Sequence, residues 1–144
     1  MTSKEEMYYD KKDLIVFQEG IFGFEDQKEF LPLPVEENTD AVLSLQSIQD
    51  EEVGFIIMNP FLLKQDYDPI LQAEDLEALN VKDTKDLSFY VIAVVKHPME
   101  ESTLNFKCPI VVNALTREAR QVILEEGDYS FRETLKDLTP TKEA

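Results

Sequence analysis

Apolar and polar residues alternate with a period of two along much of the chain. Between Leu104 and Val112, residues 104, 106, 108, 110 and 112 are apolar and share one face of an extended strand. Similar short runs are separated by Gly, Pro, Asn or acidic residues, and they occupy Asp13–Gln18, Phe30–Val35, Val42–Ile48, Gly54–Met58, Leu87–Val95 and Arg120–Leu124. The pattern therefore predicts about seven short strands.

Helical spacing is confined to two short segments. Residues 73–79 carry two leucines three positions apart, with acidic residues near the start, where negative charge stabilises a helix. Phe61–Leu63 is a second candidate. Many strands and little helix favour a sheet that closes on itself, because open edges promote aggregation. We therefore predict a mainly β fold: a small single-domain antiparallel β-barrel with about seven or more short strands and one or two short helices.

Length and composition predict one domain over residues 1–144, with polar ends near 1–10 and 136–144 that fray. The longest apolar run, Phe89–Val95, is far shorter than the roughly 20 residues of a membrane span. The first residues lack the basic start and apolar centre of a signal peptide. The single cysteine, Cys108, cannot form an internal disulfide and is typical of a reducing compartment. These features predict a cytoplasmic protein that does not contact the membrane.

The chain is strongly acidic. Its 30 acidic and 14 basic residues give a net charge of −16. Residues 1–80 hold 19 acids and 5 bases (−14), and residues 81–144 hold 11 and 9 (−2). Such a surface repels phosphate, which disfavours direct nucleic-acid binding, and it attracts basic proteins at long range. The alternative is that the acidity serves solubility alone.

The sequence contains no fingerprint of a common enzyme, metal site or nucleotide site. His97 is interpreted as a turn residue and not as a general base. Asp66 and Asp68 could contact a cation, but Pro69 and Ile70 follow where a calcium loop needs an oxygen ligand and a glycine. We therefore predict a protein that is not an enzyme and uses no cofactor, metal or small-molecule substrate.

Three motifs occur in order along most of the chain. They are Gly20-Ile21-Phe22-Gly23-Phe24-Glu25, Asn59-Pro60-Phe61, and the stretch from Pro109 to Leu124, in which a polar, basic bend joins two β-branched runs. Together they resemble the flagellar assembly factor FliW family of motile bacteria. The motif residues of the third stretch are Pro109, Asn113, Thr116, Arg117, Arg120 and Gln121. Their interpretation is structural, in satisfying loop carbonyls or pairing with acids; partner contact is the alternative.

The resemblance implies a protein antagonist of the translational repressor CsrA that also binds flagellin, and so couples flagellin synthesis to flagellum assembly. Flagellin in the cytoplasm holds the antagonist; after flagellin export, the freed antagonist binds CsrA and relieves repression. The resemblance also implies docking on the C-terminal part of CsrA instead of its RNA face. Negative charge brought close to the RNA path then lowers RNA affinity.

Contact residues follow from these two partners. Acidic edges suit CsrA, and the candidates are Asp50, Glu51, Glu52, Glu74, Asp75 and Glu77. Amphipathic helices of flagellin need an apolar groove, and the candidates are Phe22, Phe24 and Phe61. For Phe22 and Phe24, the residues themselves favour covering the core, and an exposed docking edge is the alternative.

Other classes of function stay open at this stage. They are a small-molecule-binding β-barrel, an unrecognised carboxylate enzyme, and a nucleic-acid mimic that competes directly with RNA. An enzyme needs carboxylates that converge in a pocket, whereas an antagonist needs them spread over an outer face.

Overall fold

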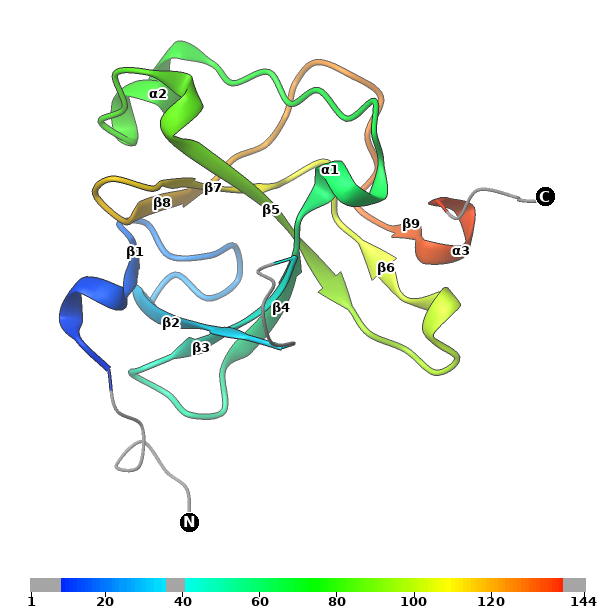
Figure 1. Cartoon of the computed structure of the whole chain (residues 1–144), viewed down its shortest axis with the longest axis horizontal. Coiled ribbons are helices and arrows are strands. Elements are labelled where there is room, and N and C mark those ends of the chain that lie inside the picture. Colours follow the sequence, from blue (N-terminus) through cyan, green and yellow to red (C-terminus); the bar gives the residue numbers. More distant parts are fainter. Residues whose placement is uncertain (1–8, 36–40, 139–144) are drawn as a thin grey trace.

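Seven strands close into a barrel in the computed structural model, which describes residues 9–35 and 41–138 (Figure 1). These strands are β1 (Ile15–Phe17), β2 (Glu29–Pro34), β3 (Val42–Ser47), β4 (Gly54–Met58), β5 (Leu87–Val94), β7 (Ile110–Asn113) and β8 (Glu118–Gln121). They follow the order β4-β3-β2-β1-β8-β7-β5, and pairing of β4 with β5 closes the ring. Two short strands, β6 (Thr103–Leu104) and β9 (Glu133–Thr134), extend the sheet from β5.

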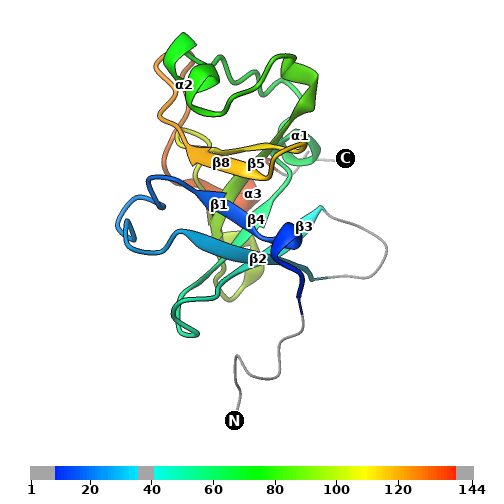
Figure 2. The same cartoon turned by 90° about the vertical axis from the view of Figure 1, so that its left-hand side faces the viewer.

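The predicted mainly β barrel is confirmed, with one departure from antiparallel pairing. β1 and β8 run parallel, with Val16 opposite Glu118 and Phe17 opposite Ala119. Figure 2 shows β1 between β8 and β2 on this side of the barrel. In a closed ring, strand directions alternate all the way round only when the number of strands is even. A ring of seven therefore needs at least one parallel pair.

Both predicted helical segments form helices, and a third short helix follows. α1 spans Pro60–Leu63, α2 spans Ala73–Ala78 and α3 spans Leu135–Leu138; the 3₁₀ turns are η2 (Lys11–Asp13), η3 (Thr84–Asp86) and η4 (Met99–Glu101). Asn59 caps α1, because its Oδ1 accepts a hydrogen bond from the Phe61 N–H at 2.9 Å. No helix in the described ranges is long and apolar enough to span a bilayer. The sequence predicts that the two ends of the chain fray. Most of those ends, residues 1–8 and 139–144, lie outside the described residues.

Two clusters of buried side chains lie on the two faces of the sheet. The inner cluster fills the barrel with alternate residues of its strands, including Phe17, Phe30 and Ile110. The outer cluster packs Tyr67, Phe106 and other side chains against the opposite face. Every residue of β7 is buried: Ile110 and Val112 enter the inner cluster, Val111 enters the outer cluster, and Asn113 is a buried polar residue.

The prediction of one strand from Leu104 to Val112 is wrong. β6 ends at Leu104 and β7 begins at Ile110, although the apolar positions between them are buried as expected. Asn105 Oδ1 accepts a hydrogen bond from the Cys108 N–H at 3.0 Å and turns the chain. The two strands therefore pair with different halves of β5.

Candidate protein-docking surfaces

An apolar groove of about 410 Å³ opens where β4 and β5 separate beyond the Ile56–Ala93 pair. We call it the Phe22 groove, and the residues that matter for its chemistry are Phe22, Phe55, Ile92, Val94, Phe131 and Arg132. Phe22, Val94 and Phe131 are 47%, 54% and 59% exposed. Large exposed apolar side chains that share one groove are typical of a protein-docking site.

The loop that carries Phe22 is held in place by its backbone. Gly20 has φ +73°, and a Cβ atom there would lie 2.5 Å from the Glu25 Cα, so the turn requires glycine. The Phe22 N–H donates to Gln121 Oε1 at 2.9 Å. The Gln121 Nε2 donates to the Cys108 carbonyl at 3.2 Å. Gln121 therefore positions Phe22 at the groove, a relation between residues 99 positions apart that no local pattern reveals.

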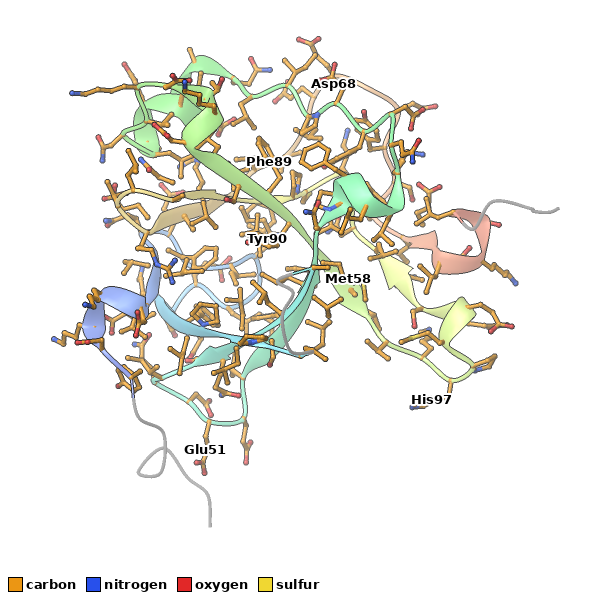
Figure 3. All side chains as sticks on the ribbon, in the orientation of Figure 1. Glu51, Met58, Asp68, Phe89, Tyr90 and His97 are labelled. Carbon is orange, nitrogen blue, oxygen red and sulfur yellow. The ribbon has the colours of Figure 1, made fainter. Side chains whose placement is uncertain are left out.

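The structure separates the three aromatic candidates. Phe24 lies on the same loop as Phe22, is 41% exposed, and packs edge to face on Phe55 at 5.1 Å between ring centroids. Phe61 lies on α1, where its ring contacts Tyr67 and Phe89, and it lines a different pocket. Figure 3 marks Phe89 on β5, beside α1. Phe22 and Phe24 therefore belong to one surface and Phe61 to another.

The β3–β4 turn presents three exposed carboxylates, Asp50, Glu51 and Glu52, which we call the acidic turn. Asp50 Oδ1 accepts a hydrogen bond from the Glu52 N–H at 3.0 Å. The Gln46 Nε2 donates to the Glu51 carbonyl at 3.1 Å. These bonds order the turn, and Figure 3 shows Glu51 directed away from the barrel. The acidic turn is therefore a preformed negative surface.

The acidic residues of α2 differ from one another in exposure. Glu74 and Glu77 are exposed, but Asp75 is 7% exposed. Asp75 Oδ1 lies 3.0 Å from Arg120 Nε, and Arg120 Nη1 lies 3.3 Å from Glu19 Oε1. Asp75 is thus occupied by an internal ion pair. In Figures 1 and 2, α2 and the acidic turn lie at opposite ends of the molecule, so the structure does not bring the two acidic groups together.

Asn113 is the buried polar centre of the third motif. Its Oδ1 accepts hydrogen bonds from the N–H groups of Leu115 and Thr116 at 3.0 and 3.4 Å. Its Nδ2 donates to the Leu79 carbonyl at 2.9 Å. The Thr116 hydroxyl lies 3.2 Å from Glu118 Oε1. Asn113 therefore shapes the β7–β8 hairpin and ties it to the end of α2.

Arg117 and Pro109 also make internal contacts. Arg117 adopts φ +69° and donates from Nη2 to the Asp13 carbonyl at 2.7 Å. The Pro109 carbonyl accepts the Val122 N–H at 3.0 Å. The hydrogen bonds of these motif residues thus connect η2, the end of α2 and the β7–β8 hairpin.

The candidate catalytic and metal-binding residues lie apart from one another. His97 is exposed at the tip of the connection after β5, and Asp68 lies at the other end of the molecule (Figure 3). Within residues 9–35 and 41–138, no group of three or more His, Cys, Asp or Glu side chains could hold a metal ion. Burial raises the pKa of the Tyr67 hydroxyl, and the nearby Tyr129 and Cys108 side chains raise that pKa further. Burial likewise raises the pKa of the Cys108 thiol, against the opposing effect of Lys107.

The fold and its surfaces define a small mixed β-barrel with an apolar groove and separate acidic surfaces. The family described as FliW protein matches residues 1–135. A solved structure described as a crystal structure of the flagellar assembly factor FliW superposes with a TM-score of 0.85 at 32% identity, and the match covers 95% of this chain and 93% of that one.

Named relatives agree with the structural match. A flagellar assembly factor FliW from Ruminiclostridium cellulolyticum is 36% identical over 127 residues, which cover 88% of this chain and 85% of the relative. One from Thermotoga neapolitana is 38% identical over 125 residues, with 86% and 83% covered. The chain therefore belongs to the FliW family of flagellar assembly factors, as the three sequence motifs predict.

Proposed function

We propose that this chain is a cytoplasmic, non-enzymatic antagonist of CsrA that also binds flagellin. The observation that carries the proposal is the FliW family match over residues 1–135. The structure supports it with two kinds of docking surface on one barrel, an apolar groove and the acidic turn. Together they suit two partners of different chemistry.

Flagellin is proposed to occupy the Phe22 groove. The apolar face of an amphipathic helix needs a groove with exposed aromatic anchors, and Phe22 and Phe131 supply them. Phe24, whose ring packs edge to face on Phe55, extends this surface. Phe61 points to a different pocket, so it is left out of the proposed flagellin site.

CsrA is proposed to dock on exposed carboxylates. Those of the acidic turn and of Glu74 and Glu77 are available, whereas Asp75 is paired with Arg120. A partner that binds RNA is basic near its RNA path, and a chain of net charge −16 attracts it at long range. Docking outside the RNA face then weakens RNA binding through the electrostatic field.

The proposed cycle is tested by co-purification of the tagged protein from extract of its own motile bacterium. We expect flagellin and CsrA to elute in two separate complexes, each with the tagged protein. Capture of neither partner would remove the proposed function. Binding to CsrA that is already saturated with RNA then separates the two forms of antagonism, because a strict RNA mimic is excluded by bound RNA.

Neutralising and reversing the acidic turn is expected to slow association with CsrA about tenfold and to flatten its dependence on salt. The variant is Asp50→Asn, Glu51→Lys and Glu52→Lys, because asparagine keeps the side-chain oxygen that accepts the Glu52 N–H. Stopped-flow association rates at several salt concentrations give the comparison.

The matched control for the acidic turn is Glu125→Lys, Glu126→Lys and Asp128→Asn, in another exposed acidic turn. It changes the net charge by the same amount. Equal slowing by both variants would assign the effect to net charge and not to the acidic turn.

A further inference from the structure

The Phe22 groove carries a cation at its rim. Arg132 lines the groove, is exposed, and directly follows Phe131, the most exposed of the groove's aromatic side chains. Its backbone N–H donates to the Ser130 hydroxyl at 3.0 Å, which fixes the local turn. Its guanidinium makes no hydrogen bond or ion pair with any other residue in the described ranges. Arg132 is therefore available to a partner.

The other described arginines are already engaged within the fold. Arg117 donates to the Asp13 carbonyl, and Arg120 pairs with Asp75 and Glu19. An acidic chain would be expected to provide a carboxylate for an exposed guanidinium as well, since acids outnumber bases 30 to 14. The guanidinium of Arg132 stands out because it has none in the part of the chain that the structure describes.

Nearby carboxylates lie outside the lining of the groove: Glu19 and Glu25 line a neighbouring pocket that shares Phe22 and Gln121 with it. The lining of the groove, as far as the structure describes it, contains no carboxylate. Lys107 is close enough to the groove residue Cys108 to lower the pKa of its thiol, although burial outweighs that effect. The described lining of the groove thus carries a cation and no carboxylate, in a molecule of net charge −16. A negative group on a partner is repelled by most of the surface and attracted here.

We propose that the segment of flagellin bound by the Phe22 groove carries an acidic residue beside its apolar residues, and that its carboxylate pairs with the Arg132 guanidinium. The inference rests on the proposed function. It adds that a carboxylate, together with apolar side chains, determines which flagellin segment binds the groove. Phe22, Val94 and Phe131 hold the apolar face. Arg132 fixes register, because a guanidinium offers a planar pair of donors that matches a carboxylate. An apolar segment without an acid binds more weakly in this groove.

The test is the dissociation constant of full-length protein for monomeric flagellin, measured by calorimetry. We expect Arg132→Glu to weaken binding about tenfold or more, because it removes the pair and adds repulsion. Arg132→Lys keeps the charge and should recover part of the loss. The control is Lys82→Glu, which changes the net charge equally at an exposed site outside the groove and should change affinity less than threefold.

A charge swap identifies the partner group. Flagellin variants in which single acidic residues of the terminal segments become arginine should include one that weakens binding to the unmodified protein and restores binding to Arg132→Glu. If unmodified protein binds flagellin and Arg132→Glu binds it as tightly as Lys82→Glu does, the inference is overturned and the proposed function stands. If unmodified protein does not bind flagellin at all, the proposed function itself fails.

Discussion

Replacing Phe22 and Phe131 together with aspartate is expected to weaken flagellin binding by about 100-fold or more, with little change in folding. Each side chain is a large, exposed aromatic on the same groove. Anchors of this kind contribute about 2 kcal/mol or more apiece, and each 1.4 kcal/mol is a factor of ten in affinity. Aspartate also places an unpaired charge where an apolar helix face should pack. Calorimetric titration with monomeric flagellin measures the loss.

The control for the groove variant is Leu115→Asp. Leu115 is 75% exposed on the β7–β8 hairpin and does not line the groove. It tests whether any apolar-to-acidic change on this acidic surface weakens flagellin binding. Circular dichroism and chemical denaturation establish that both proteins fold. Full affinity in a folded Phe22→Asp, Phe131→Asp protein would exclude the groove as the flagellin site.

Replacing Asp75 with alanine is expected to lower the free energy of unfolding by about 3 kcal/mol. Asp75 is nearly buried and has two functions in the fold. Its Oδ1 pairs with Arg120 Nε at 3.0 Å, and its Oδ2 accepts the Gln72 N–H at 3.2 Å at the start of α2. The variant removes this capping-box hydrogen bond to the N-cap residue Gln72, and it leaves Arg120, which is partly buried, with Glu19 as its remaining acidic partner. Urea denaturation followed by circular dichroism gives the value.

A second ion pair provides the comparison for Asp75. Lys85 Nζ lies 3.7 Å from Asp83 Oδ2, and the two side chains are 82% and 53% exposed. Lys85→Ala should therefore lower the free energy of unfolding by less than about 1 kcal/mol. The double variant Asp75→Ala, Arg120→Met should lose less stability than the sum of the two single changes, because no uncompensated charge is then left. If Asp75→Ala loses as little unfolding free energy as Lys85→Ala, then the Asp75–Arg120 ion pair and the Gln72–Asp75 hydrogen bond do not stabilise the fold.

Most of the barrel could be predicted from periodicity, because alternate residues of its strands face either the filled interior or the other side of the sheet. Gly54–Met58 has the same bounds in the sequence pattern and in β4. The pattern failed between Leu104 and Val112, where burial continues through a turn stabilised by Asn105. Alternate residues are buried there although residues 105–109 belong to no strand. A period of two in the sequence cannot distinguish a paired strand from such a turn.

The candidate site was partly predictable. The acidic turn was identified because clustered like charges are stable only in water, and it is exposed. The sequence pattern does not distinguish Asp75 from Glu74 and Glu77. Asp75 is nevertheless buried, because its carboxylate pairs with Arg120, which is 45 positions away in the chain. Phe131 and Arg132 were not among the predicted residues, because their position beside Phe22 depends on the path of the chain after β8.

The family, the mainly β architecture, the strong negative charge and most strand positions are all readable from the residues alone, because they follow from residue type, motif order and local alternation. Which residues act together became visible in the folded chain. It separated Phe61 from Phe22, paired Asp75 with Arg120, and placed beside an apolar groove the Arg132 guanidinium, which has no ion pair within residues 9–35 and 41–138. These relations join residues distant in the chain, and closure of the barrel brings them within contact distance.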